Sequence, residues 1–423
     1  MIARRPGQGL PTQAHTWSDL KAAYRFFGNP KIEPGAIGGP HRAWTRRQCA
    51  AHPVVLCVHD GSDLQAARIP GNQYVQQSSL ALTPEGRVIG LLEQRWYARV
   101  RTPPGETQEQ RQTRWRESDV WPDAVGAIGT PGPGCRLIHV ADRAADDVRF
   151  MRACGKTRTG FVVRARFDRR LKHQESKVWQ HMASRAPAGT LAINIGAQRR
   201  GPGQKPRRAR EARVQVRFGT LELRRPGRDS QPQTPGALKV QAVYVHEIDP
   251  PKEVEPVDWM VLTSEKVESF QDACVVVGYY QARWVIEEWH RCLKEGCALE
   301  ESQVDEVGDL KRLAAVLSIV AVRMLALRDL ADQERCGTNA DDPLVLKASV
   351  PESWILVVAG LFGEDPATLT PRQFWRNIAR QGGWIGRTAD GRPGWKTIWR
   401  GWYDVTQMVR GAELTVEQHR CFA

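Results

Sequence analysis

The chain is long and strongly basic, and these two properties limit the classes of protein to which it can belong. Its 423 residues are enough for two or three domains with well-formed cores. It carries 61 lysines and arginines against 47 aspartates and glutamates, a formal net charge of +14. This excess of positive charge favours a polyanionic partner, most simply nucleic acid. No apolar run approaches the roughly 18 residues of a membrane-spanning helix, so a membrane protein is excluded.

The nine cysteines include no C-x-x-C pair, and no signal peptide precedes them. This usage is typical of a reduced, cytoplasmic protein. It also argues against a zinc site built from thiolates.

The N-terminal part of the chain predicts two helices. Residues 16–28 form the first, which starts at Thr16 or Ser18 and stops before Asn29-Pro30. A second helix is expected over 40–52.

A strand and a hairpin are expected next. The apolar run from Val54 to Val58 ends on Asp60 and is bounded by Gly61, which predicts a buried central strand with an acid at its tip. Segments 77–83 and 88–99 alternate across a Pro-Glu-Gly turn and predict a hairpin beside that strand.

A second apolar strand, Leu137 to Ala141, ends on Asp142 and leads into a helix, and a further strand is expected over 160–167. From about 170 to 262 the pattern changes to turns and separate strands. These strands are expected at 190–196, 213–224 and 237–248.

A basic arm is expected between these strands, since residues 199–217 hold eight lysines or arginines against one glutamate. Its Gly and Pro content predicts an extended arm, and its charge favours phosphate contacts by Arg207, Arg208 and Arg210. A solvated loop remains an alternative. Further on, 309–333 predicts a long amphipathic helix.

The C-terminal tail spaces Trp395, Trp399 and Trp402 at i, i+4 and i+7. Such a stripe packs into a core or against a partner more often than it touches a ligand.

The segment YYQARWVIEEWHRCLK places one carboxylate among cations on a predicted single helix. At 100° per residue its polar side chains share an arc of about 80°: Tyr280, Arg283, Glu287, Arg291 and Lys294. The opposite face is apolar and can pack on a core. A carboxylate that holds a divalent metal beside cations that hold phosphates fits this pattern. A solvated face with a Glu287–Arg291 pair is the alternative.

Asp60, Asp142 and Glu287 together predict a metal site. Carboxylates at the ends of neighbouring buried strands converge in open α/β sheets. Three of them suit a hard cation such as Mg²⁺ or Mn²⁺, although each aspartate alone could be a turn or cap residue. His59 and His290 flank the acids, but lone histidines usually have neighbouring partners, so neither is assigned as a ligand.

These residues resemble a known family. The chain is similar to the DDE cut-and-paste transposases of bacterial insertion sequences, in the insertion-sequence-four and transposon-five group marked by Tyr-x2-Arg-x3-Glu-x6-Lys. Tyr280, Arg283, Glu287 and Lys294 meet that pattern, and DGSDL at 60–64 and DRAAD at 142–146 stand where the family keeps its two aspartates. The similarity runs from about Ala22 to the tryptophans near the C-terminus.

The resemblance implies an α/β protein with an RNase H-like catalytic core, a mixed sheet flanked by helices and interrupted by a β-rich insertion. It also implies domain boundaries: a truncated N-terminal helical DNA-binding region at 1–52, the two parts of the core at 53–169 and 263–333, the insertion at 170–262, and a C-terminal helical region that dimerises at 334–423. The implied location is the bacterial cytoplasm, on the nucleoid when DNA is bound.

The implied chemistry uses two Mg²⁺ or Mn²⁺ ions, one held by Asp60 and Asp142 and the other by Asp60 and Glu287. Water would nick double-stranded DNA at the transposon end, the freed 3′-hydroxyl would form a hairpin, water would reopen it, and the end would join target DNA. The family acts as a homodimer on two DNA ends.

The resemblance also implies DNA contacts. Arg283, Lys294 and Arg291 would neutralise phosphates, with Tyr280 bonding one of them. Arg164 would lie near the terminal nucleotides. Trp259 would stack on a base flipped out for the hairpin, whereas by residue type alone it favours a core or rim position.

The family pattern is not met in full. Members usually carry more helical turns before the segment that matches 16–28, and residues 1–14 look unlike folded protein. A second hypothesis is therefore a truncated transposase that binds DNA or forms dimers and inhibits transposition. A third is another RNase H-like nuclease or resolvase, since one fold hosts many chemistries.

Overall fold

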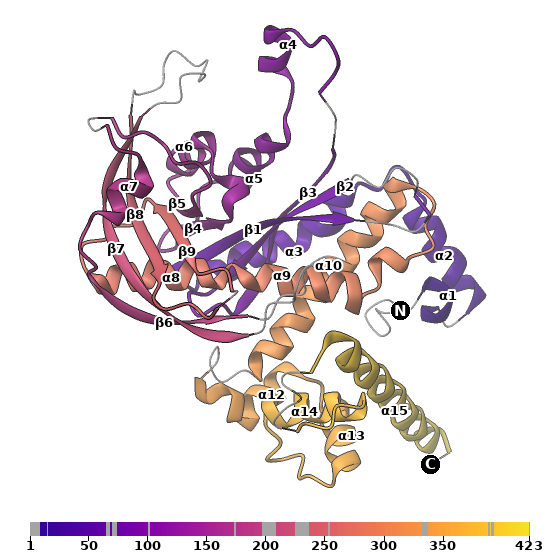
Figure 1. The fold of residues 1–423 in the computed structure, drawn as a ribbon. Helices are drawn as coiled ribbons and strands as arrows, with labels where there is room; N and C mark the ends of the chain where they lie inside the picture. The colour runs from indigo at the N-terminus through magenta and orange to yellow at the C-terminus, as the bar shows by residue number, and fades with distance from the viewer. Residues whose placement is uncertain are drawn as a thin grey trace. The chain divides into compact units, whose positions relative to one another are not determined.

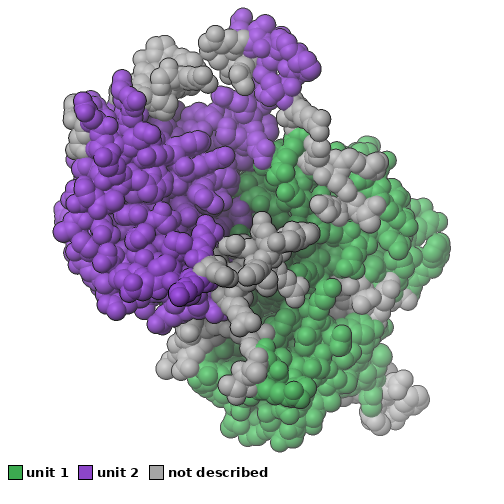
Figure 2. Space-filling view, viewed as in Figure 1, with its two compact units in different colours: residues 1–49, 61–99, 285–423 green, residues 50–60, 100–284 purple. Residues whose placement is uncertain are grey.

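The chain folds into a mixed α/β structure that divides into two compact units, shown in Figure 2. The computed structural model describes residues 9–14, 16–64, 68–69, 74–99, 102–172, 175–196, 209–224, 237–252, 254–331, 337–387, 390 and 393–422. Unit 1 comprises 1–49, 61–99 and 285–423, and unit 2 comprises 50–60 and 100–284. Within the described residues, no helix is both long enough and apolar enough to cross a bilayer.

In the described part of the chain, nine strands form a mixed sheet in the order β3-β2-β1-β4-β5-β9-β8-β7-β6. The strand bounds are β1 Val54–Leu64, β2 Tyr74–Leu82, β3 Val88–Ala98, β4 Arg136–Ala141, β5 Gly160–Arg164, β6 Gly189–Ile195, β7 Arg210–Arg224, β8 Ala237–Glu247 and β9 Asp258–Thr263. β1, β4 and β5 run parallel, whereas the pairs from β5 to β6 are antiparallel. The predicted strands and hairpin are confirmed.

β1 is longer than its apolar pattern predicts. Its residues Val55 to Val58 are fully buried, as expected of a parallel strand covered on both faces. The strand does not stop at Asp60 but continues to Leu64, so the expected tip is wrong. Gly61 permits this continuation, because a Cβ there would lie 2.9 Å from Gln77 and 3.3 Å from Val75 of β2.

The helices of unit 2 in the described residues are α4 Gln108–Thr113, α5 Val120–Ile128, α6 Val148–Lys156, α7 Val178–Ala183 and α8 Phe270–Ala282. All but α4 lie close to the sheet or to a helix that covers it. Figure 1 shows α5 and α6 on one side of β4 and β5 and α8 on the other. α8 contacts β4, β5, β7, β8 and β9, so one helix supports both the parallel strands and the antiparallel ones.

In unit 1, the β2–β3 hairpin packs through β3 against α3 Pro34–Cys49 and α10 Val307–Leu330, and α10 also contacts α2 Trp17–Phe27. A short α1 Leu10–Gln13 precedes α2. The predicted helix 16–28 is confirmed, with Thr16 as its cap. The second helix begins at Pro34, ahead of the expected start, and the expectation that 1–14 is unlike folded protein is wrong for Leu10–Gln13.

The predicted basic arm is partly a strand. Residues 210–217 belong to β7, where they pair with both β6 and β8, because the valines and alanine that alternate with the charged residues are buried. Residues 199–208 lie outside the described residues.

The predicted single helix over 279–294 is three elements. α8 ends at Ala282, α9 spans Trp284–Arg291, and a π-helical turn covers Cys292–Gly296. At the junction the amide of Arg283 donates to the carbonyl of Tyr280 at 3.2 Å, a tighter turn than an α-helix makes. The prediction of an apolar face is confirmed, since Val285, Ile286, Trp289, Cys292 and Leu293 are all buried.

The C-terminal part of unit 1 is helical. Its helices are α12 Pro343–Ser349, α13 Glu352–Phe362, α14 Pro371–Gln381 and α15 Trp395–Phe422. Trp395 and Trp399 are buried, and the Trp402 ring lies 4.4 Å from that of Trp354 on α13. Of the two roles that the sequence left open for the stripe, packing into a core or against a partner, Trp395 and Trp399 take the first.

Candidate active site

The two predicted aspartates lie on neighbouring strands of unit 2. β1 pairs with β4 in parallel, and Val58 is the register partner of Val140. Two residues further along each strand, this register brings Asp60 beside Asp142, which directly follows β4. Side chains two residues apart point to the same face of a strand. The backbone therefore directs both carboxylates to one edge of the β1–β4 pair.

Asp60 lies beside Arg283, which the resemblance implies as a phosphate contact. Its carboxylate lies 3.7 Å from the Arg283 guanidinium, and the two side chains are 15% and 13% exposed. An ion pair at this depth is screened less than one on the surface. Arg283, at the end of α8, thus holds positive charge next to Asp60.

Asp142 also fulfils the alternative prediction of a cap residue. Its Oδ1 accepts the amide of Ala144 at 2.8 Å and caps the turn Arg143–Ala145. An ionised carboxylate has about four acceptor positions, so one cap bond is compatible with ligand binding. Asp142 is half-buried and can reach solvent.

Trp259 and Tyr280 meet in unit 2. Their rings lie edge to face, with centroids 5.1 Å apart, and Trp259 is half-buried whereas Tyr280 is buried. Nearby on β5, Arg164 donates to the carbonyl of Asp258 at 2.9 Å. Tyr280 and Arg164 therefore both contact the start of β9, which carries Asp258 and Trp259. The three predicted DNA contacts lie close together there.

Glu287 lies on α9 in unit 1, where it is half-buried. One turn later Arg291 is exposed. Lys294 donates to the backbone carbonyl of Asp63 and lies 3.2 Å from Glu300. The π-helical turn therefore directs the Lys294 ammonium to the end of β1.

The sequence interpretation missed a buried charge network behind α9. Arg328 of α10 contacts Glu288 at 2.7 Å and Asp329 at 2.9 Å, and its guanidinium lies over Trp395. Burial alone would lower the pKa of Arg328, but the two carboxylates outweigh it and raise that pKa, so the side chain stays charged. The sequence did hold a sign of this network, because Arg328 interrupts the apolar face of the predicted helix 309–333. The network ties α9, α10 and α15 together.

Arg210 has an intramolecular role. It forms a bidentate pair with Glu247 of β8, whose carboxylate also accepts the amide of Val257 at 2.8 Å. In this pair the Arg210 side chain is only 16% exposed. Its surroundings therefore favour a role in stabilising the β7–β8 pair over a role in binding phosphate. Arg207 and Arg208 lie outside the described residues.

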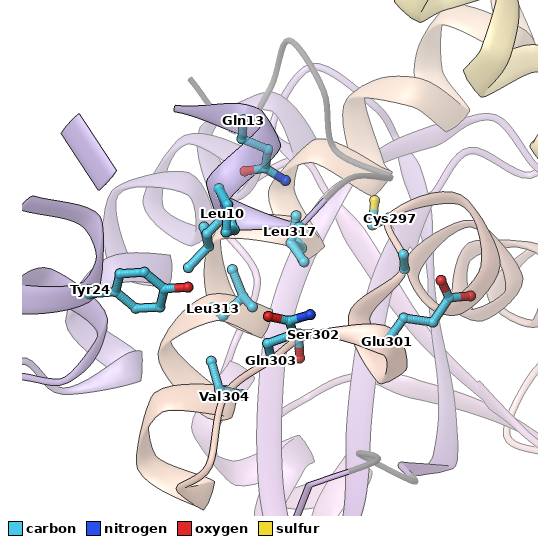
Figure 3. Close-up of a pocket in the computed structure, with 13 residues that line it drawn as sticks. Leu10, Gln13, Tyr24, Cys297, Glu301, Ser302, Gln303, Val304, Leu313 and Leu317 are labelled. Atoms are coloured by element: carbon cyan, nitrogen blue, oxygen red, sulfur yellow. The ribbon is translucent and has the colours of Figure 1, made fainter. Parts of the chain in front are cut away.

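Unit 1 contains a cavity of about 180 Å³ beneath its N-terminal helices, shown in Figure 3. Its lining comes from α1, α2, α10 and the segment 297–304, and includes Leu10, Gln13, Tyr24, Cys297, Glu301 and Leu317. None of the predicted site residues lines it.

Comparison with protein families connects both ends of unit 1 to transposition. Residues 1–32 match the family described as transposase DNA-binding, and residues 367–419 match the family described as transposase Tn5 dimerisation domain. The two matches support a Tn5-like transposase. The first covers α1 and α2, and the second covers α14 and most of α15, so DNA binding and dimer formation are each linked to named helices.

Proposed function

We propose that this chain is a metal-dependent transposase that cleaves double-stranded DNA at the ends of its element and joins them to target DNA. The observation that carries the proposal is the β1–β4 register, which directs Asp60 and Asp142 to one edge of the sheet. The DNA-binding and dimerisation matches near the two ends of the chain support the same function.

The catalytic acids in this proposal are Asp60, Asp142 and Glu287. The mixed sheet, and the antiparallel strands β6 to β9 that precede α9, suit an RNase H-like core with a β-rich insertion. In that arrangement Glu287 would supply the third acid of the set.

The donor set fits two hard cations, Mg²⁺ or Mn²⁺, since it consists of half-buried carboxylates, whose oxygens are the ligands that such cations prefer. Asp60 and Asp142 would hold one ion, and Asp60 and Glu287 the other. When bound, such ions activate an attacking oxygen and stabilise a leaving oxygen at phosphorus.

The protein's own residues position the DNA. Arg283 orients Asp60 and supplies positive charge beside the scissile phosphate. Lys294, held by the Asp63 carbonyl, and the exposed Arg291 contact neighbouring phosphates. Trp259 offers its half-buried indole to a flipped base, and Tyr280 fixes that ring by its edge-to-face contact.

The proposed reaction is a series of in-line displacements at phosphorus. Water nicks one strand, the new 3′-hydroxyl attacks the other strand to give a hairpin, water reopens it, and the 3′-end joins target DNA. Each step replaces one ester oxygen on phosphorus with an oxygen from water or from a 3′-hydroxyl, so one site serves all of them.

The test is a cleavage assay on a labelled duplex that carries the end of the element flanking this reading frame. With Mg²⁺ or Mn²⁺ we expect nicked and hairpin products, and none in chelator. A chain that binds the duplex and dimerises but gives no product would instead be the inhibitor of the second hypothesis.

A further inference from the structure

A cluster of three potential metal ligands lies inside unit 2, on the face of β1 opposite to Asp60. Cys57, His59 and His139 are all fully buried. One ligand atom of each lies within 4.8 Å of the others. His59 Nε2 is 2.7 Å from His139 Nδ1 and 3.5 Å from Cys57 Sγ.

The backbone brings these side chains together. Cys57 and His59 are two residues apart on β1 and therefore share a face, while Asp60 points to the other. His139 is the register partner of Cys57 on the neighbouring parallel strand β4. Two rigid central strands thus present three donors before any ligand binds, which lowers the entropic cost of forming a site.

The two imidazoles already direct ring nitrogens at each other. His59 Nε2 and His139 Nδ1 share one hydrogen bond, so both nitrogens point into the cluster. Nε2 of His139 has no partner among the described residues.

The surroundings are apolar. Trp121 on α5 and Phe150 on α6 make T-shaped contacts with His59, with ring centroids 6.5 and 6.2 Å away, and the Phe150 centroid also lies 6.4 Å from that of His139. An apolar shell excludes solvent and strengthens binding of a charged ion to its ligands.

We propose that Cys57, His59 and His139 bind one Zn²⁺ ion that fastens β1 to β4 behind the acids. Zinc–nitrogen bonds of about 2.0 Å and zinc–sulfur bonds of about 2.3 Å place tetrahedral donors roughly 3.3–3.5 Å apart, so the two imidazoles must separate by roughly half an ångström. The three side chains supply three of the four tetrahedral ligands, and a water molecule would supply the fourth. The Cys57 thiol loses its proton to solvent on binding, and the proton between the rings moves to the other nitrogen of its own ring.

The donor set distinguishes this site from the proposed catalytic one. Imidazole and thiolate favour Zn²⁺ over Mg²⁺, whereas carboxylates favour Mg²⁺ or Mn²⁺. The two sites share β1 but use alternate residues of it. Zinc therefore acts here as a structural element, and its loss would loosen the strands that carry Asp60 and Asp142.

The first measurement is the metal content of the full chain, purified without a polyhistidine tag and without chelator, by inductively coupled plasma mass spectrometry. We expect about one zinc per chain, less than about a fifth of that in Cys57→Ser and His139→Gln, and no loss in Asp60→Ala. Cys154→Ser is the matched control, since Cys154 is a buried thiol of the same unit outside the cluster. Wild-type protein without zinc, or variants that keep it, would overturn the proposal.

A second measurement on the wild type does not depend on the folding of variants. Chelator-treated protein titrated with Co²⁺ should develop visible d–d bands and a near-ultraviolet thiolate-to-cobalt band, saturating at about one ion per chain. If folded, chelator-treated protein shows none of these bands after the addition of Co²⁺, the proposal is wrong. Neither result depends on DNA cleavage, so failure of the zinc site and failure of the transposase proposal are distinguishable.

Discussion

The end of β4 and the turn that follows it each carry an aspartate, and the two have different surroundings. Asp142, at the strand end, is half-buried and makes one cap hydrogen bond, to Ala144. Asp146 is fully buried and accepts the amides of Arg166 and Phe167 at 2.6 and 3.1 Å and the Arg169 guanidinium at 2.7 Å. Both belong to the DRAAD segment, where residue type cannot separate them.

The difference shows that the surroundings of a carboxylate decide whether it is suited to bind a ligand or to stabilise the fold. A half-buried acid with spare acceptor positions can bind a cation, whereas an acid surrounded by donors stabilises the fold.

The largest expected effect is the loss of DNA cleavage when one of the proposed catalytic acids is removed. Asp60→Ala, Asp142→Ala and Glu287→Ala should each lower DNA cleavage at least about 1,000-fold, because each removes a metal ligand. DNA affinity by fluorescence anisotropy should change little, and so should the thermal midpoint of Asp142→Ala. The midpoint of Asp60→Ala should fall, because that change removes the ion pair with Arg283. Glu295→Gln, in the exposed part of the π-helical turn, is the matched control and should cleave normally. Any acid whose removal leaves cleavage intact does not belong to the site.

Asp146 should behave in the opposite way. Asp146→Ala strands the Arg169 charge and two backbone amides in the interior, so we expect a loss of about 3–5 kcal/mol of unfolding free energy. Urea denaturation measures this, and a double-mutant cycle with Arg169→Met isolates the ion pair. If Asp146→Ala folded as stably as wild type and lost only cleavage, the contrast with Asp142 would be reversed.

Two tryptophans extend the contrast to uncharged side chains. Trp259 is half-buried, whereas Trp289 is fully buried and donates to the Ser318 carbonyl. Trp259→Ala should slow hairpin formation about 10-fold more than first-strand nicking, since base stacking on an aromatic ring contributes about 1–3 kcal/mol. Single-turnover kinetics with labelled DNA resolve the two steps. An equal slowing of both would make Trp259 structural.

The smallest expected effect is a pH dependence from His41 on α3. Its buried Nε2 accepts the amide of Leu91 at 3.2 Å, and burial, with Arg323 and Arg42, lowers its pKa to about 4. Between its ordinary pKa of 6.5 and pH 4 the unfolded chain binds the proton more readily, so the stability present above pH 6.5 is lost as pH falls.

This pH effect is measurable as a difference between two urea midpoint profiles from pH 7.5 to 4.5, those of wild type and His41→Gln. The wild-type midpoint should fall more steeply below pH 6.5, because the variant has no proton to take up at that position. Parallel profiles would show that His41 does not contribute.

Local patterns in the sequence predicted much of the fold. Alternation and apolar runs located the strands, because burial on one or both faces imposes a period on neighbouring residues. The same reasoning identified the apolar face of α9 and the core role of Trp395 and Trp399. The two aspartates next to the ends of apolar runs were likewise visible as candidates.

Other features depended on contacts between residues far apart in the chain. The length of β1 depends on β2, which fits against Gly61, and the role of Arg210 depends on Glu247. The Cys57, His59 and His139 cluster depends on strand register across 80 residues. The spacing of residues along the chain does not predict such partners.

The sequence alone determined where apolar and charged residues recur, and hence which segments become strands and helices and which acids can end them. Only the tertiary structure decided which acid is enclosed by donors and which stays half-buried, and which histidines face each other across two strands. The physical reason is that periodicity reflects burial of a segment's own face, whereas the partner of a buried charge or imidazole is supplied by another segment.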